Sequence, residues 1–436
     1  MATLADARPG SGRRVLYLAW GFPPYRGSGV ANPLAAVNAL AKRGHEVTVL
    51  AAGTDTFALA MGADWGLVEQ IDPAVTVVRV DQPGAWNDPI ASRWPEVLRR
   101  YGGAAPQWLR DVEVKMFPEP IRNDWYPAWL PVATAAARAL HRAKPFDLVI
   151  ATILPAVSAG VALNLNAAAG VPFVVYERDS WVFSPFTGEP YEDADRSRPL
   201  LEEVFERAEQ VWYINTPIAD LHRREFAAWA DKIREVRNGW EAAFVPEVIT
   251  PAPRAGRGLV FRFVGTADVG FPSAFVNEAW RLARAASPVV QDSTLEFVGV
   301  AADNVKAHSA EGVKWSEPVL KRDLAAVYAS ADVLLFIKEG GPMATSGKVY
   351  EYTATGLPIA SSMAPGHDAR AVLGGRPLWF DAAEHTPAGL AAALVAAAAH
   401  EPTAAELAAA RRHGQRFRRD LIFDAAFGQL EASLGW

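Results

Sequence analysis

The chain has no cysteine among its 436 residues. Disulfide bridges, thiolate metal sites and cysteine nucleophiles are therefore excluded. Long apolar runs are also missing, because the longest, 390–399, falls well short of the roughly 20 residues of a membrane-spanning helix. The polar N-terminus, MATLADARPGSGRR, lacks the apolar core of a secretory signal peptide. We therefore expect a cytoplasmic protein, with peripheral attachment to the inner face of a membrane left open.

Positive charge is too scarce for a nucleic-acid-binding surface. The formal net charge is −6, whereas a nucleic-acid binder needs a basic face. The 8 histidines are scattered, and no two of them stand at the i,i+4 spacing of a helical metal site. No acidic cluster has the pattern of a calcium loop. We therefore expect neither a nucleic-acid partner nor a metal cofactor.

What the first half of the chain does contain is a regular alternation of short apolar strands and helical segments. This rhythm predicts a parallel sheet covered by helices on both faces. A first helix is expected over 30–43, between the first two strands. The predicted strands are 15–19, 46–50, 75–80, 147–152, 172–177, 211–214 and 233–236.

The pattern breaks over 238–258, where TPAPRAGRG is typical of a linker, and then begins again. The sequence predicts an α/β fold of two Rossmann-like domains that face a central cleft. We expect an N-terminal domain over 1–240, a C-terminal domain over 241–415, and a final helix, 416–436, that packs back on the first domain. The second domain's predicted strands are 259–265, 295–300, 312–315, 332–337 and 358–362, with helices over 275–286 and 321–330 and from 387 onward.

The loop WGFPPYRGSGVAN after the first strand places Gly27, Ser28 and Gly29 just before a helix. Glycine permits close backbone approach, and a helix N-terminus attracts anions, so this loop is a candidate seat for a phosphate or a sugar. A tight strand-to-helix turn is the structural alternative. Dinucleotide binding is disfavoured, because Asn32 replaces the third glycine of that fingerprint and strand two ends without an acidic residue.

A second candidate follows a buried strand in the segment YERDSWVF. Asp179 has the chemistry to take a proton from an acceptor hydroxyl, and Arg178 has the chemistry to bind phosphate. The side-chain alternation of a strand turns only some of these consecutive charges toward the cleft. A solvated charged turn with an internal ion pair is the alternative interpretation.

The third candidate is the helix start SGKVYEY, which follows the glycine-rich loop KEGGPMAT. Ser346 is a plausible N-cap, so that the free amides of Gly347 and Lys348 can cradle a phosphate. Glu351 lies one turn deeper on the same face, where a carboxylate suits the two hydroxyls of a ribose. A surface ion pair is the alternative, although it leaves the glycine-rich approach unexplained.

Aromatic residues crowd the region 86–130, which has no recognisable motif. Aromatic rings stack well on sugars and flat acceptors, so Trp125 and Tyr126, and further along the chain Trp181 of the RDSW segment, are candidate acceptor contacts. The alternative is an insertion that packs a small core of its own. If the region is functional, it binds the acceptor or rests on a membrane that carries a lipid acceptor.

Taken in order, these segments resemble the family-four glycosyltransferases. SGKVYEYTATGLPIA is similar to the family's K-x-x-E-Y-x-A-x-G-x-P block, and PPYRGSGVANPLAAVNALAKRGHEVTVL to its N-terminal block. YERDSW resembles an R-D-x-W segment of a branch that builds surface polysaccharides. KIREVRNGWE and LVFRFVGTAD are similar to the blocks that end the first domain and open the second. The resemblance covers roughly residues 13 to 362 and implies retaining enzymes of glycosyltransferase B-type (GT-B) fold that use nucleotide-sugar donors.

The resemblance also implies roles for individual residues. Glu351 would bind the donor ribose, and the loop from Glu339 through Gly340 and Gly341 to Ser346 and Gly347 would meet the sugar and the diphosphate. Gly265 and Thr266 would border the donor from the end of the second domain's first strand. Gly27, Ser28 and Gly29 would face the sugar, and Asp179 with Arg178 would lie by the acceptor.

Three positions depart from the family pattern. Met343 stands where the family has a glutamate eight residues before Glu351, so Lys348 or a displaced Glu339 would take its place. The segment GTADVGFPS lacks the family's lysine, and Arg262 lies inside the preceding strand. Thr152 stands where the family often has histidine.

The sequence therefore predicts a retaining, metal-independent glycosyltransferase with catalytic residues Asp179, Arg178, Lys348 and Glu351. It would move a sugar from a nucleotide-diphosphate sugar to a hydroxyl or amine of a polysaccharide, a lipid-linked carrier or a natural product. Two alternatives stay open: a nucleotide-sugar epimerase or hydrolase of the same fold, and a non-catalytic nucleotide-sugar-binding partner protein.

Overall fold

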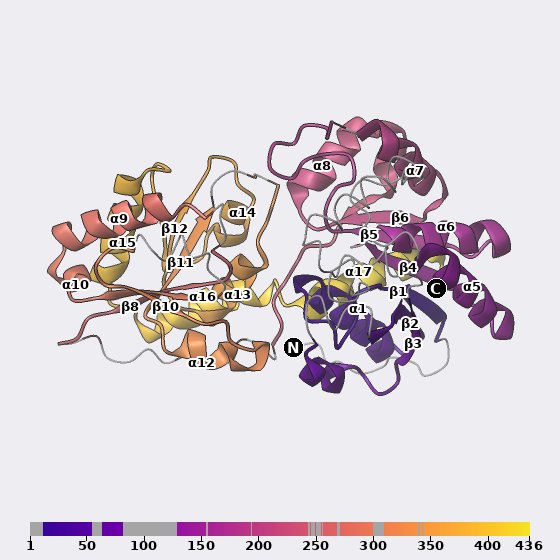
Figure 1. The fold of residues 1–436 in the computed structure, drawn as a ribbon, viewed down its shortest axis with the longest axis horizontal. Coiled ribbons are helices and arrows are strands. Elements are labelled where there is room, and N and C mark those ends of the chain that lie inside the picture. The colour runs from indigo at the N-terminus through magenta and orange to yellow at the C-terminus, as the bar shows by residue number, and fades with distance from the viewer. Residues whose placement is uncertain are drawn as a thin grey trace, which may run out of the picture. The chain divides into compact units, whose positions relative to one another are not determined.

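The computed structural model describes most of the chain as two compact units. Unit 1 comprises Met1–Ser184, Glu189–Val236 and Phe423–Trp436, and unit 2 comprises Pro185–Gly188 and Arg237–Ile422 (Figure 1). The described residues are 12–54, 63–81, 129–153, 156–192, 194–242, 245, 249, 254, 256–267, 271–299, 309–338, 341 and 343–436.

Unit 1 is built on a parallel sheet, seven-stranded in the described part of the chain. Its central strands are buried along their whole length, as expected when helices cover both faces. Every pairing is parallel; for example, Tyr17 of the first strand lies opposite Val49 on one side and Ile150 on the other. In sheet order the strands are β3 (Thr76–Val80), β2 (Glu46–Ala52), β1 (Arg14–Leu18), β4 (Leu148–Ile153), β5 (Phe173–Glu177), β6 (Gln210–Tyr213) and β7 (Ile233–Glu235).

Among the described helices of unit 1, some begin at a short polar cap or an early proline and others do not. Asn215 caps one of them, because its side-chain oxygen accepts a hydrogen bond from the amide of Ile218. The helical segments are η1 (Ser28–Val30), α1 (Ala31–Lys42), η2 (Trp65–Gln70), α5 (Trp129–Ala143), α6 (Val157–Ala169), α7 (Ala194–Arg207), α8 (Thr216–Glu225) and η4 (Ala227–Lys232).

Unit 2 repeats the plan with a parallel sheet whose described strands number six. In sheet order they are β10 (Val313–Ser316), β9 (Thr294–Val298), β8 (Val260–Val264), β11 (Val333–Lys338), β12 (Ile359–Met363) and β13 (Trp379–Asp381). Its helical segments are α9 (Ser273–Ala286), α10 (Pro288–Gln291), η5 (Lys321–Asp323), α12 (Leu324–Ala329), α13 (Gly347–Thr355), α14 (Ala369–Leu373), α15 (Pro387–Ala399), α16 (Ala404–Gln415) and α17 (Arg419–Leu434), whose last part belongs to unit 1.

Strand β11 shows how the sequence divides unit 2 into two cores. Successive side chains of a strand point to opposite faces. Val333, Leu335 and Ile337 pack with α9 and α15 on one face, while Leu334 and Phe336 pack with α12, α13 and α14 on the other. An apolar residue at nearly every position is therefore what a sheet covered on both faces requires.

The strand orders locate the edge at which each unit can hold a ligand. In unit 1 the order reverses between β1 and β4, and in unit 2 it reverses between β8 and β11. Open α/β sheets bind ligands at such a switch point, outside the carboxyl ends of the strands. The loops after β1, β8 and β11 are the candidate loops of the sequence analysis.

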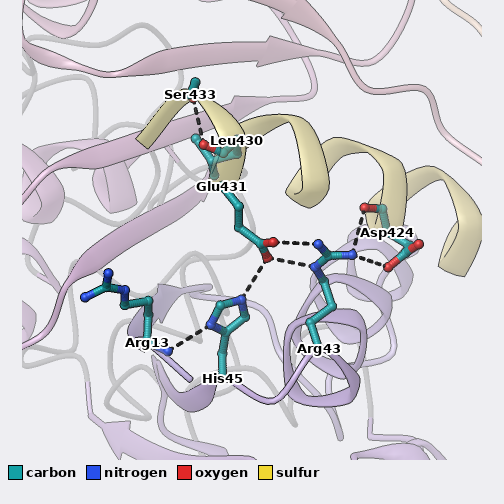
Figure 2. A network of polar contacts seen from close by, with 7 residues as sticks. All are labelled: Arg13, Arg43, His45, Asp424, Leu430, Glu431 and Ser433. Carbon is teal, nitrogen blue, oxygen red and sulfur yellow. Dashed lines mark hydrogen bonds and ion pairs between the residues drawn. The ribbon is translucent and has the colours of Figure 1, made fainter. Parts of the chain in front are cut away.

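The end of the chain joins unit 1 through a polar cluster and an apolar face. Arg43 pairs with Glu431 and Asp424 of α17, and Glu431 also pairs with His45 at 2.9 Å (Figure 2). Arg43 hydrogen-bonds Glu431 twice, which raises the pKa of the guanidinium above its ordinary value. Beside this cluster, Phe423, Phe427 and Leu430 are buried. We call the pairs among Arg43, His45, Asp424 and Glu431 the α17 clasp.

Candidate functional site

In unit 1, the glycine loop after β1 leads directly into a helix start. The backbone of Gly27 is extended, η1 begins at Ser28 and α1 begins at Ala31. Within the described residues, no side chain caps either helical segment. The first amides therefore keep their hydrogen-bonding capacity, and the positive end of the helix dipole lies at this loop.

Gly29 lies directly against Arg178, which follows β5. A Cβ atom at position 29 would come within 2.8 Å of Arg178 Nη1, so a glycine leaves room for the guanidinium. The Nε atom of Arg178 is buried and has no hydrogen-bond partner in the described part of the chain. The fold thus brings the Arg178 guanidinium beside the start of a helix that lies some 150 positions earlier in the sequence.

The three consecutive charges after β5 have three different surroundings. Glu177 is fully buried, Arg178 is half-buried beside Gly29, and Asp179 is exposed. Trp181 is only 5% exposed, and its backbone N–H donates to Glu177 Oε1. Asp179 is therefore reachable by a ligand, whereas most of the Trp181 ring is covered; its acceptor role stays a prediction.

Asn32 and Thr152 have structural partners that the sequence did not reveal. Asn32 Nδ2 donates to the Tyr176 hydroxyl at 3.1 Å, and that hydroxyl donates to the carbonyl of Val236 at 3.0 Å. This chain of bonds ties the start of α1 to β5. Thr152, at the position where the family often has histidine, hydrogen-bonds to the hydroxyl of Tyr17.

In unit 2, α13 begins as the sequence predicted. The Ser346 side chain accepts from the amide of Lys348 and so acts as the N-cap. Gly347 is the first helical residue, and no described atom lies within 4 Å of where its Cβ would be. The first turn of α13 is therefore open to an approaching group on that side.

Glu351 is held by two partners rather than by one. Lys348 Nζ lies 2.7 Å from Glu351 Oε2, and the hydroxyl of Tyr328, on α12, donates to the same oxygen. Burial raises the pKa of Glu351, but the charge of Lys348 and the two hydrogen bonds outweigh it, so the pKa lies below its ordinary value. Its side chain remains 20% exposed, and Oε1 accepts no hydrogen bond from the described residues.

Three residues that the sequence did not single out support the approach to α13. Thr345 Oγ1 donates to Asp368 Oδ2 at 2.6 Å, and Arg237 binds both oxygens of Asp368 at 2.9 and 3.2 Å. Asp368 is buried and joins this loop to the segment that opens unit 2. These partners are up to 131 positions apart, so no local pattern could have revealed them.

Arg262 has a structural task inside unit 2. Its guanidinium pairs with Glu296 and donates to the carbonyl of Val327 and the hydroxyl of Ser330. It therefore anchors the end of α12, the helix that carries Tyr328. With these partners, Arg262 is committed to the sheet and is no replacement for the family's lysine.

The other predicted donor contacts are placed only in part. Gly265 ends β8, where its amide bonds to the carbonyl of Val298, and Thr266 beside it is exposed. Gly341 lies in the loop before α13 with φ +69°, a conformation that favours glycine. Glu339, Gly340, Trp125 and Tyr126 lie outside the described residues, as does the side chain of Ser28. Their roles stay predictions.

The first unit of the chain matches a known protein family. Residues 29–239 match the model of the glycosyl transferase 4-like domain. Residues 29–239 therefore form a glycosyl transferase 4-like domain. The matched stretch includes Gly29, Arg178 and Asp179, so the glycine loop and the charged turn after β5 both lie within this domain. A search of curated proteins finds no match.

Solved structures share the fold of the whole enzyme. HepE from Anabaena, solved with UDP and glucose, is 13% identical with a TM-score of 0.58, covering 97% of this chain and 100% of its own. A glycosyltransferase from Rickettsia africae is 11% identical with a TM-score of 0.62, covering 98% and 99%. A putative UDP-N-acetylglucosamine 2-epimerase from Listeria monocytogenes is 11% identical with a TM-score of 0.56, covering 98% and 97%. At these identities the likeness shows the fold, which is GT-B.

Among the described residues, no helix is both long enough and apolar enough to cross a bilayer.

Proposed function

We propose that the enzyme transfers a sugar, with retention of configuration and without a metal, from a nucleotide-diphosphate sugar to an acceptor hydroxyl or amine. The donor nucleotide would bind unit 2 and the acceptor unit 1. The observation that carries this proposal is the environment of Glu351, a partly exposed carboxylate fixed one helical turn below an open glycine.

The donor contacts follow from the order of groups along α13. A diphosphate at the helix start would meet the amides near Gly347 and the positive end of the dipole. The ammonium group of Lys348 would move from Glu351 toward the diphosphate, where it would stabilise the negative charge that develops as the sugar departs. Because helix amides and Lys348 supply positive charge, we assign charge stabilisation to them and expect no metal requirement.

Glu351 would hold the ribose of the donor. Its Oε2 is already engaged by Lys348 and Tyr328, which fixes the orientation of the carboxylate. The second oxygen, Oε1, is left to accept from a ribose hydroxyl. The lowered pKa keeps this group ionised at neutral pH, which is the state that accepts two hydrogen bonds.

The acceptor would lie near Asp179 and Arg178 in unit 1. Asp179 is exposed and able to orient an acceptor hydroxyl, while Arg178 and the start of α1 offer positive charge to an anionic group. In the mechanism that the family resemblance implies, the leaving phosphate takes the acceptor proton on the face of attack. Because HepE was solved with UDP and glucose, UDP-glucose is the first donor to test.

Replacing Glu351 by alanine tests the donor site. We expect the affinity for the donor nucleotide to fall about 10- to 100-fold, the usual cost of losing hydrogen bonds to a charged group, and turnover to be lost. Calorimetry with UDP-, GDP- and dTDP-sugars and the release of nucleoside diphosphate in the presence of a panel of acceptors would measure both. Circular dichroism should show an unchanged fold.

The matched control is Glu278→Ala. Glu278 pairs with Arg281 at the same i,i+3 spacing on α9, with its side chain largely exposed. We expect normal binding and turnover in this variant. Normal turnover in Glu351→Ala would remove the donor-site assignment, and conversion of a nucleotide sugar without any acceptor would favour the epimerase alternative instead.

A further inference from the structure

Glu177 is a fully buried carboxyl at the point where β5 ends. Its neighbours in the sheet are Ile153 on β4 and Tyr213 on β6. One side of the group is therefore apolar, and the other is a phenol ring. A carboxyl in such a place is expensive to ionise unless something pairs with it.

The carboxyl fixes the turn that carries Arg178 and Asp179. Its Oε1 accepts from the amide of Trp181 at 3.0 Å, which closes a loop of four residues around the two charges. Two further hydrogen bonds hold the end of the turn, because Ser180 Oγ accepts from the amides of Val182 and Phe183 at 3.2 and 3.0 Å.

His222 completes this support from α8. Its Nδ1 donates to the carbonyl of Ile218 at 2.8 Å, so Nε2 is left to accept from the Ser180 hydroxyl at 3.1 Å. Burial lowers the pKa of His222 to about 4, so the ring is neutral at physiological pH. The turn is thus held between a carboxyl on β5 and a neutral imidazole on α8.

The surroundings of the Glu177 carboxyl favour its protonated form at neutral pH. Burial raises its pKa to about 8, and the charge of Asp179 acts in the same direction, against the hydrogen-bonding groups of Tyr213 and Trp181. Neither Glu177 Oε2 nor the Tyr213 hydroxyl completes a hydrogen bond of normal geometry in the described residues. Among the described residues, Arg178 itself and Arg198 of α7 add positive charge near the turn, and Arg198 packs over the rings of Phe183 and Phe226.

We propose that Glu177 is a positioning residue of the acceptor site, which holds the Arg178–Asp179 turn as a neutral hydrogen-bonding group and so leaves Asp179 as the turn's sole negative charge. This inference rests on the proposed function of Asp179 and Arg178. An ionised Glu177 would place a second negative charge beside Asp179 and compete for the adjacent guanidinium. Activity should therefore fall as the carboxyl ionises, although the group contacts neither donor nor acceptor.

Two substitutions separate shape from charge. Glu177→Gln keeps an oxygen for the Trp181 amide and never ionises, whereas Glu177→Leu removes the hydrogen bond. Glu203→Gln is the matched control, because Glu203 is a half-exposed carboxyl of unit 1 that pairs with Arg207 on the same helix, far in sequence from the turn.

Infrared spectroscopy of the full-length protein reads the proton directly and needs no substrate. The wild-type protein should show the C=O band of a protonated carboxyl at pH 7, and this band should disappear as the pH rises past about 8. The band should be missing in Glu177→Gln and present in Glu203→Gln. Its absence from the wild-type spectrum at pH 7 would overturn the inference, whether or not any turnover is detected.

The pH profile of kcat/KM, measured with the donor and acceptor that the panel identifies, tests the positioning role. We expect Glu177→Gln to match the wild type at pH 7 and to lose the alkaline decline near pH 8. Glu177→Leu should lose about 10- to 100-fold in kcat/KM, the cost of a displaced reacting group, with donor affinity unchanged. Equal losses in both variants, or an alkaline decline that persists in Glu177→Gln, would contradict the proposal. Weak donor binding in the wild type would instead count against the proposed function.

Discussion

Glu351 and Glu177 are two glutamates whose surroundings move their pKa values in opposite directions. Burial raises the pKa of both, but Glu351 has Lys348 and the Tyr328 hydroxyl beside it, whereas Glu177 has Asp179. One carboxyl is therefore kept ionised and the other neutral at the same pH. Each state suits its place, since the ionised group can accept from a ribose and the neutral group can sit inside a sheet.

The neutral state of Glu177 should be visible in the pH dependence of stability. Its pKa is about 8 in the folded protein and about 4.5 when unfolded, so between these values only the folded protein holds the proton. The contribution of this group is complete below pH 4.5 and is lost as the pH rises toward 8.

Between pH 4.5 and 8 the wild type should lose stability through this residue as the pH rises, whereas Glu177→Gln should not. We therefore expect the difference between their free energies of unfolding to change in favour of Glu177→Gln, by at most about 1.4 kcal/mol per pH unit. Urea denaturation at pH 5, 6, 7 and 8 measures the difference, and other titrating groups cancel because both proteins share them. Two parallel curves would show that Glu177 ionises normally in the folded protein.

At the scale of elements, α13 is defined by residues at both of its ends. Ser346 caps its start, and Gly356 ends it with φ +81°, in the left-handed conformation that glycine adopts readily. A Cβ at position 356 would also come within 2.9 Å of the carbonyl of Leu407 on α16. The helix that carries Lys348 and Glu351 therefore begins and ends at fixed points, which holds both side chains in place.

The α17 clasp should contribute measurably to the stability of unit 1. Removing Arg43 by substitution with methionine leaves the half-buried Glu431 beside His45 without its main partner. We expect the free energy of unfolding to drop by about 1 to 3 kcal/mol, the usual range for hydrogen bonds to a charged group. Chemical denaturation of the full chain measures the change.

Asp220→Asn is the control for the clasp. Asp220 pairs with Arg223 on the surface of α8, with both side chains substantially exposed, and exposed pairs contribute little. Its loss should leave the unfolding curve nearly unchanged. Equal effects of the two substitutions would mean that the clasp acts only as an ordinary surface ion pair. A double substitution of Arg43 and Glu431 that costs less than Arg43→Met alone would support the argument.

At the scale of the molecule, the two units divide the substrates between them in the proposed function. Nucleotide alone should then protect only part of the chain from hydrogen exchange, because a ligand stabilises what it binds. We expect UDP, or the nucleotide that the panel selects, to slow exchange in the peptides around Ser346–Glu351. The peptides around Glu177–Phe183 should respond only when acceptor is also present. Protection confined to Glu177–Phe183 would reverse the assignment of the two substrates.

The sequence predicted the sheets well, because buried parallel strands are continuous apolar runs that repeat between helices. Strands such as β1, β5 and β11 lie within one or two residues of their predicted ranges. The edge strand β13 was missed, since its three half-buried residues carry no such run. The start of α13 was also predictable, because a cap, a glycine and an i,i+3 pair are local signals.

The contacts that support the site could not be predicted from the sequence. Tyr328 meets Glu351 from 23 positions away, and Asp368 meets Arg237 across 131 positions. The close approach of Gly29 and Arg178 is of the same kind. Such pairs depend on how strands are ordered in a sheet, and neither composition nor periodicity encodes that order directly.

The way the chain closes unit 1 has a consequence for its synthesis. Phe423, Phe427 and Leu430 cover an apolar face of a sheet whose strands were all made by residue 235. A nascent chain emerging from the ribosome must therefore carry that face bare until the segment 423–436 has been translated. Maturation of the first half thus waits for the second, and a fragment cut near residue 240 should aggregate because it lacks its own last helix.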